Sequence, residues 1–138
     1  MNKQIEDLIS KYEDEGFFTR VAPTSDMIDD AQQKLGVKMP EQFLEYLKVY
    51  SHGGINGTLV LGVGMTGNVM FLETTLEYRN YGLPENLIVI ENCDEWVYCL
   101  DANTGRVVSW SQQDGVMDEY ACFDDFLLDE LKEAIANL

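Results

Sequence analysis

Residues 82–110 read GLPENLIVIENCDEWVYCLDANTGRVVSW, and this stretch decides the fold class. Leu87–Ile90 is a continuous apolar run of the kind that forms a strand buried on both faces, so we expect it at the centre of a sheet. Residues 96–100 and 107–110 also have strand character, and they flank Asp101–Gly105, which is typical of a hairpin turn. The stretch therefore predicts a mostly antiparallel or mixed twisted sheet.

Helical periodicity precedes this sheet and follows it. Thr24 and Ser25 are suitable N-caps for a second helix that ends at Gly36, and Pro40 occupies the expected first position of a third. In all four predicted helices the apolar residues recur at offsets of three and four. These apolar faces are Ile5, Leu8, Ile9 and Tyr12; Ile28, Ala31 and Leu35; Phe43, Leu44, Leu47 and Tyr50; and Phe123, Phe126, Leu127, Leu131 and Ile135.

The central part of the chain predicts mixed structure. We expect strands at Thr58–Leu61 and Asn68–Leu72 and a short helix at Thr74–Tyr81. Residues 62–67, GVGMTG, have the glycine spacing of a dinucleotide-binding fingerprint, but that fingerprint requires a helix after the glycines, and a strand-like run follows. Helices, then strands, then a closing helix packed on the sheet predict one α+β domain over residues 1–138.

The charge of the chain limits its partners. Acidic residues outnumber basic ones 25 to 9, a net charge of -16, which excludes direct binding to nucleic acids or anionic membranes. Residues 91–130 hold 11 acids and one base, Arg106, whereas the residues before Glu91 hold 13 acids and 7 bases. The excess either solubilises the chain or forms a surface complementary to a basic partner, and its uneven distribution favours the second interpretation.

Motifs for metals, cofactors or catalysis are scarce. Cys93, Cys99 and Cys122 lack the spacing of a zinc knuckle, so we expect reduced thiols, no metal and no cofactor. His52 is the only histidine and follows Ser51 directly, where the two side chains do not face each other. The sequence therefore predicts a protein that is not an enzyme, with a small enzyme or ligand-binding domain as the alternative from another class.

The location of the protein follows from similar observations. Residues 1–7 are polar and acidic, unlike a secretory signal, and no apolar run approaches the length of a membrane span. An odd number of cysteines argues against a disulfide framework. We therefore expect a cytoplasmic protein.

Residues 28–40, IDDAQQKLGVKMP, continuing to Gly53–Gly54, resemble the opening motif of the SUKH superfamily, in its Smi/Knr-like branch. Members have a helix ending in Leu-Gly, a Leu-Pro start to the next helix and an Asn-Gly-Gly exit. Gln32 and His52 stand where the family often has Glu and Asn. Further matches in the family's order, to its strand block and final helix, are residues 82–90, 98–101, 105–110 and 123–127.

The resemblance implies a bacterial immunity protein. Such members bind and neutralise the C-terminal domain of a polymorphic toxin encoded beside them, often a nuclease. A nuclease domain is basic because its substrate is a polyanion, so an acidic inhibitor can compete for that surface. Other members are intracellular regulatory or scaffold modules, which is the alternative function without a toxin partner.

Aromatic residues on the predicted hairpin mark the expected docking site. Trp96 and Tyr98 share one parity and should face the same side of the sheet, as a core cluster or as a binding hot spot. Acidic residues close in sequence would surround them. The predicted partner-binding residues are Glu91, Asp94, Glu95, Trp96, Tyr98, Trp110, Asp114, Asp118 and Glu119.

Overall fold

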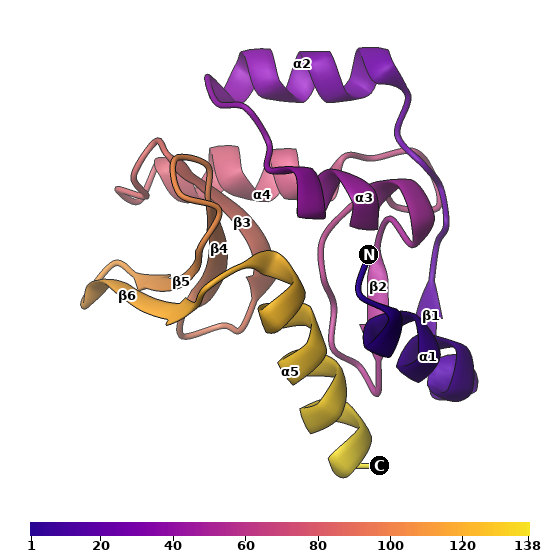
Figure 1. Ribbon diagram of the computed structural model, residues 1–138. Coiled ribbons are helices and arrows are strands. Elements are labelled where there is room, and N and C mark those ends of the chain that lie inside the picture. Colours follow the sequence, from indigo (N-terminus) through magenta and orange to yellow (C-terminus); the bar gives the residue numbers. More distant parts are fainter.

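Figure 1 shows the computed structural model, which describes all 138 residues and confirms the α+β class. Five α-helices accompany a two-stranded and a four-stranded sheet, both antiparallel. The helices are α1 (Lys3–Tyr12), α2 (Ser25–Leu35), α3 (Glu41–Val49), α4 (Met70–Arg79) and α5 (Phe123–Ala136), with a 3₁₀ turn η1 (Glu13–Glu15). The strands are β1 (Gly16–Phe18), β2 (Gly53–Ile55), β3 (Leu87–Asn92), β4 (Val97–Asp101), β5 (Val107–Ser111) and β6 (Gly115–Tyr120).

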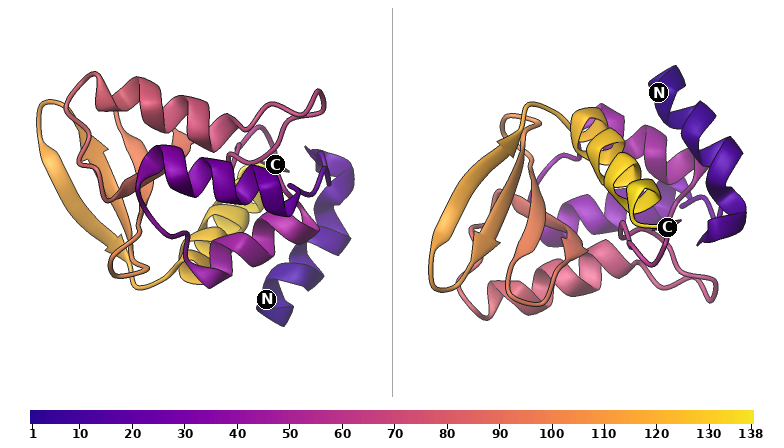
Figure 2. Two further views of the ribbon diagram at one scale, coloured as in Figure 1. Left: turned by 90° about the horizontal axis from the view of Figure 1, so that it is seen from above. Right: turned by 90° about the horizontal axis from the view of Figure 1, so that it is seen from below.

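Helices cover the larger sheet near β3, whereas its outer strands are partly exposed. Its strands follow the order β3-β4-β5-β6. α4 packs along β3 on one face, and α5 packs on the opposite face, where the Phe126 and Tyr98 rings are 5.2 Å apart. The β5–β6 hairpin extends away from the helices, toward the left in Figure 1 and in both views of Figure 2. The outer strands therefore leave part of each face uncovered.

The predicted central position of Leu87–Ile90 is wrong, because β3 is the edge strand. All four residues are nevertheless buried, since other segments satisfy the free edge. The Val89 amide donates to the Thr75 hydroxyl at 2.9 Å, and the Ile90 carbonyl accepts from the Leu61 amide at 2.8 Å. An edge strand covered in this way has the same continuous apolar sequence as a central strand.

The two strands predicted before β3 are also wrong. Asn68–Leu72 contains the start of α4, so the predicted helix at Thr74–Tyr81 begins earlier, at Met70. A short apolar run does not distinguish a strand from a buried helix, and here the helix-forming residues after Met70 prevail. Within Thr58–Leu61 only Val60 pairs, in an isolated bridge to Gly53. β1, β2 and β6 were not predicted.

Local signals position the helices as expected. The Thr24 hydroxyl accepts from the Met27 amide at 3.2 Å, and Gly36 ends α2 in the left-handed conformation, with φ of 71°. The Gln32 side chain accepts from the Met39 amide at 2.9 Å and so fixes the connection to α3. A cluster of 31 buried hydrophobic residues joins helices and strands. No helix is both long enough and apolar enough to cross a membrane.

Candidate protein-binding site

The turn between β3 and β4 presents Asp94, Glu95 and Trp96 to solvent. The Asn92 side chain accepts from the Asp94 amide at 2.9 Å, and Asp94 adopts a left-handed φ of 66°. The Cys93 amide closes the turn by donating to the Trp96 carbonyl at 2.9 Å. Asn and Asp tolerate this geometry, so the local sequence holds two carboxylates and an indole at the sheet's end.

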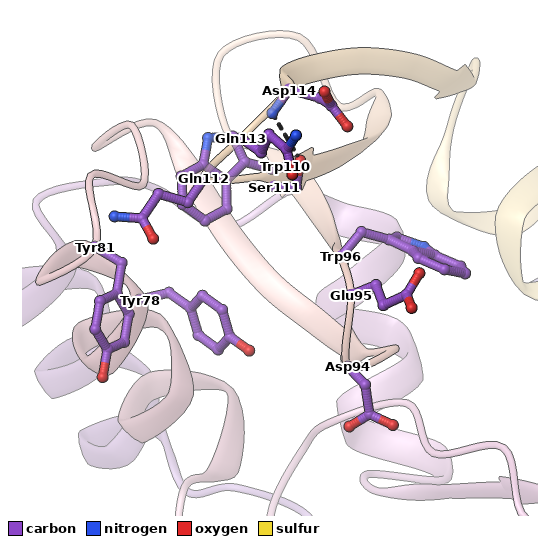
Figure 3. A pocket seen from close by; sticks show the side chains of 10 residues that line it. All are labelled: Tyr78, Tyr81, Asp94, Glu95, Trp96, Trp110, Ser111, Gln112, Gln113 and Asp114. Atoms are coloured by element: carbon purple, nitrogen blue, oxygen red, sulfur yellow. Dashed lines mark hydrogen bonds between the residues drawn. The ribbon is translucent and has the colours of Figure 1, made fainter.

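An open cavity of about 850 Å³ lies at this end of the sheet, on the side of α4 (Figure 3). Tyr78 forms edge contacts with Tyr81 and Trp110, at ring distances of 6.0 and 6.3 Å. Because Trp110 is only 6% exposed, it supports the wall of the cavity from within. The lining is aromatic, amide and acidic, without Lys or Arg: Tyr78, Tyr81, Asp94, Glu95, Trp96, Trp110, Ser111, Gln112, Gln113 and Asp114.

Trp96 and Trp110 belong to opposite faces of the sheet. Trp110 pairs with Val97, so it shares the face of Val97, whereas Trp96 and Tyr98 point to the face of α5. The Trp96 and Tyr98 rings meet edge to face at 6.3 Å, which confirms that they lie on one side. In Figure 3 the Trp96 indole points away from Tyr78 and Tyr81. The structure therefore divides the predicted aromatic set between two faces.

Two smaller cavities lie on the side of α5, and Trp96 and Tyr98 line both. The cavity nearest α5, of about 370 Å³, is lined by Asn56, Thr58, Cys93, Trp96, Tyr98, Glu130, Glu133, Ala134 and Asn137. The cavity of about 280 Å³ on the outer strands is lined by Trp96, Tyr98, Ser109, Trp110, Ser111, Asp114, Gly115, Met117 and Glu119. All three cavities meet at Trp96, which is 40% exposed, and we call their combined lining the Trp96 surface.

The predicted acids occupy different positions around this surface. Asp114 is exposed in the β5–β6 turn, where its amide donates to the Ser111 hydroxyl at 3.0 Å. Glu119 lies at the outer cavity and accepts from the Ser109 hydroxyl at 3.0 Å. Asp118 lines none of the three cavities, and its carboxylate is 3.7 Å from the Arg106 Nε. Asp118 is thus the one predicted acid that has an ion-pair partner.

Glu91 differs from the other predicted acids because it is buried, with 6% exposure. It therefore does not ring the aromatic residues on the surface. Burial raises the pKa of Glu91 to about 9, and the neighbouring carboxyl of Glu130 on α5 adds to this effect. Burial also raises the pKa of Glu130.

His52 has a structural position. Its Nδ1 accepts from the Gly62 amide at 2.9 Å, and burial lowers the pKa of the imidazole. A Cβ on Gly62 would lie 1.5 Å from the Ser51 carbonyl, so the close approach of the two loops requires glycine. Asn, the residue that the family often has at this position, also carries a hydrogen-bond acceptor.

The glycine loop at residues 62–67 is followed by α4, contrary to the strand predicted there. The loop nevertheless closes on itself: the Gly64 amide donates to the Asn68 carbonyl at 2.9 Å, and the Met70 amide donates to the Gly62 carbonyl at 2.8 Å. These amides are engaged within the loop rather than directed at a phosphate. No group of three or more His, Cys, Asp or Glu side chains is arranged to hold a metal ion, and all three cysteines are free thiols.

Sequence reasoning missed several lining residues. Tyr78 and Tyr81 are three positions apart at the end of α4, and a correct start for that helix would have placed them together. Gln112 and Gln113 line the large cavity because β6 folds back as an unpredicted strand. The sequence pattern does not mark Glu130 as a site residue, because an acidic residue beside the apolar stripe of a helix is ordinarily solvated.

Comparisons with known proteins agree with this architecture. The family model SUKH_5, described as "SMI1-KNR4 cell-wall", matches residues 5–132. A solved structure described as "Crystal structure of protein from Pseudomonas syringae pv. tomato" is similar, with 23% identity and a TM-score of 0.63. The similarity covers 83% of this chain and 87% of that one, and it concerns the fold. The extent of the family match shows that the chain belongs to the SUKH superfamily, in its SMI1-KNR4 family.

Proposed function

We propose that this protein is an immunity protein that binds and blocks the basic C-terminal domain of a cognate bacterial polymorphic toxin, with a nuclease as the expected toxin activity. Members of the family are generally non-enzymatic, and the family is consistent with an immunity role. The proposal includes a cytoplasmic location, to which three free thiols are suited.

The observation that carries the proposal is the composition of the Trp96 surface. Its linings contain six acids and no Lys or Arg, and none of these six has an ion-pair partner. Such a surface attracts a basic domain at long range. The acids are Asp94, Glu95, Asp114, Glu119, Glu130 and Glu133.

Exposed apolar side chains on or beside this acidic lining contribute a second property of an interface. Trp96 is 40% exposed, Met117 is 61% exposed, and Tyr81 is 49% exposed. Trp and Tyr are the residues that most often contribute the bulk of binding energy, while surrounding groups exclude water. Exposed apolar groups within an acidic surround suit this surface to docking with a basic protein.

The direct test is inhibition by the purified chain. The toxin domain encoded beside this gene is assayed for its nuclease activity alone and in equimolar mixture with the protein. We expect complete loss of activity and a one-to-one complex in size-exclusion chromatography. A neighbouring basic domain that stays fully active in the mixture would refute the proposal, and a gene without such a neighbour would favour a regulatory or scaffold module.

A further inference from the structure

The α5 side of the sheet contains a carboxyl group in an unusual position. Glu91 is 6% exposed, and its Oε1 atom is buried without a hydrogen-bond partner. A β-bulge between Val89 and Glu91 shifts the register so that Glu91 pairs with Tyr98. Because Tyr98 packs on Phe126, the Glu91 side chain lies on the face that α5 covers.

The ionisable groups that face Glu91 are all acidic or neutral. They are Glu130 and Glu133 from α5, Tyr46 from α3, Tyr98 from β4 and Cys93 from the following turn. Burial raises the pKa of Cys93 to about 12, with Glu91 and then Glu130 as the next causes. Carboxyl groups gathered in this way, without a cation, strongly disfavour a second negative charge.

The cavity of about 370 Å³ opens beside these groups. Glu130 and Glu133 line it on one side, and Trp96 and Tyr98 line it on the other. A guanidinium group suits this combination, because its planar fork makes two parallel hydrogen bonds to one carboxylate and its face stacks on aromatic rings. No Lys or Arg of the chain lines the cavity.

We propose that this cavity binds an arginine side chain of the protein partner, whose guanidinium pairs with the Glu130 carboxylate in the lining, while the buried Glu91 next to Glu130 releases its proton to solvent. That the arginine comes from a protein rests on the function proposed above. On binding, the Glu91 O–H bond breaks and the proton passes to water. The positive charge of the incoming guanidinium then compensates the carboxylate that remains. Binding at this site is therefore linked to pH.

The test uses agmatine, which carries the guanidinium of arginine, with the full chain and no toxin. The carboxyl ¹³C signal of Glu91 is followed by NMR from pH 5 to pH 10, with and without agmatine. We expect saturating agmatine to lower the apparent pKa of Glu91 by about two units, and the agmatine affinity to rise with pH by up to about tenfold per unit between pH 7 and 9. A Glu91 titration that agmatine leaves unchanged would overturn the proposal.

Variants locate the effect. Glu91→Gln retains the shape of the protonated side chain but has no proton to release, so agmatine affinity should become independent of pH and fall about tenfold at pH 8. Glu73→Gln, on the exposed surface of α4, makes the same substitution at a distant site and should behave as the wild type. The same agmatine affinity and pH dependence in the two variants would also overturn the proposed arginine site. Because agmatine requires no toxin, failure here leaves the inhibition assay to judge the proposed function separately.

Discussion

At the end of the sheet that carries the Trp96 surface, the two faces of strands β3 to β5 combine aromatic and acidic groups differently. On the α4 side, Tyr78 packs against both Tyr81 and a buried Trp110, and the acids are exposed at the rim. On the α5 side, Trp96 is exposed, and Glu91 is buried beside Glu130. The same hairpin thus presents apolar area supported by the core on one face and uncompensated carboxyl groups on the other.

For the proposed interface, this difference implies a division of roles between the two faces. Aromatic walls with a solvated acidic rim offer contact area, and the rim charges act mainly on the rate of encounter. Buried carboxyl groups offer selectivity for a cation, because an apolar group would leave them without a partner. Trp96 lines cavities on both faces and so connects the two.

The largest expected effect separates the two tryptophans by stability. Trp110→Ala should lower the free energy of unfolding by about 3–5 kcal/mol, because it removes a buried ring that supports Tyr78. Trp96→Ala should lower it by less than about 1 kcal/mol, because the indole is partly exposed. Chemical denaturation monitored by circular dichroism measures both, and equal losses would contradict the assignment of Trp96 to the surface.

The next effect tests the buried carboxyl of the α5 side. Because the pKa of Glu91 is raised from 4.5 to about 9, the folded state binds more protons than the unfolded state in this window, and stability falls as pH rises through it. Glu91→Gln removes this dependence and should stabilise the chain at pH 7 by on the order of 2 kcal/mol. Denaturation midpoints at pH 5, 7 and 9 check the slope, which should be steeper in the wild type than in the variant.

The smallest effect concerns the rim acids of the α4 side. The double variant Asp94→Asn, Glu95→Gln should slow association with the toxin domain several-fold at low salt and change the free energy of unfolding by less than about 1 kcal/mol. Asp7→Asn with Asp29→Asn, both at exposed helix positions remote in the chain, removes the same charge as a control. Stopped-flow rates over a salt series should converge at high salt, where screening removes the difference. Identical slowing by both double variants would assign the effect to net charge rather than to this rim.

The sequence predicts the helices better than the strands, for physical reasons. Thr24, Gly36 and Pro40 act through local backbone geometry, so α2 begins and ends, and α3 begins, close to the predicted positions. The edge position of β3 depends on Thr75 and Leu61, which are distant in sequence, and no local pattern reports such coverage. β6 has mostly exposed residues and lacks the alternation on which strand prediction depends.

The candidate site shows the same contrast between local and distant determinants. Strand parity correctly places Trp96 and Tyr98 on one face. The burial of Glu91 results from the bulge before it, which reverses parity, and from α5, which returns over the sheet from the other end of the chain. The sequence therefore predicts which residues are on the hairpin but not which helix covers each of its two faces.

The most direct test of the account is the dissociation rate of the complex with the toxin domain. Trp96→Ala should cost on the order of 2 kcal/mol in binding, equivalent to dissociation about 30-fold faster than wild type. Phe17→Ala is the matched control, because Phe17 is a more exposed aromatic residue, at 59%, on β1 and outside the three cavities. The account predicts that this control dissociates within about twofold of wild type. A wild-type dissociation rate for folded Trp96→Ala, or faster dissociation of Phe17→Ala alone, would contradict it.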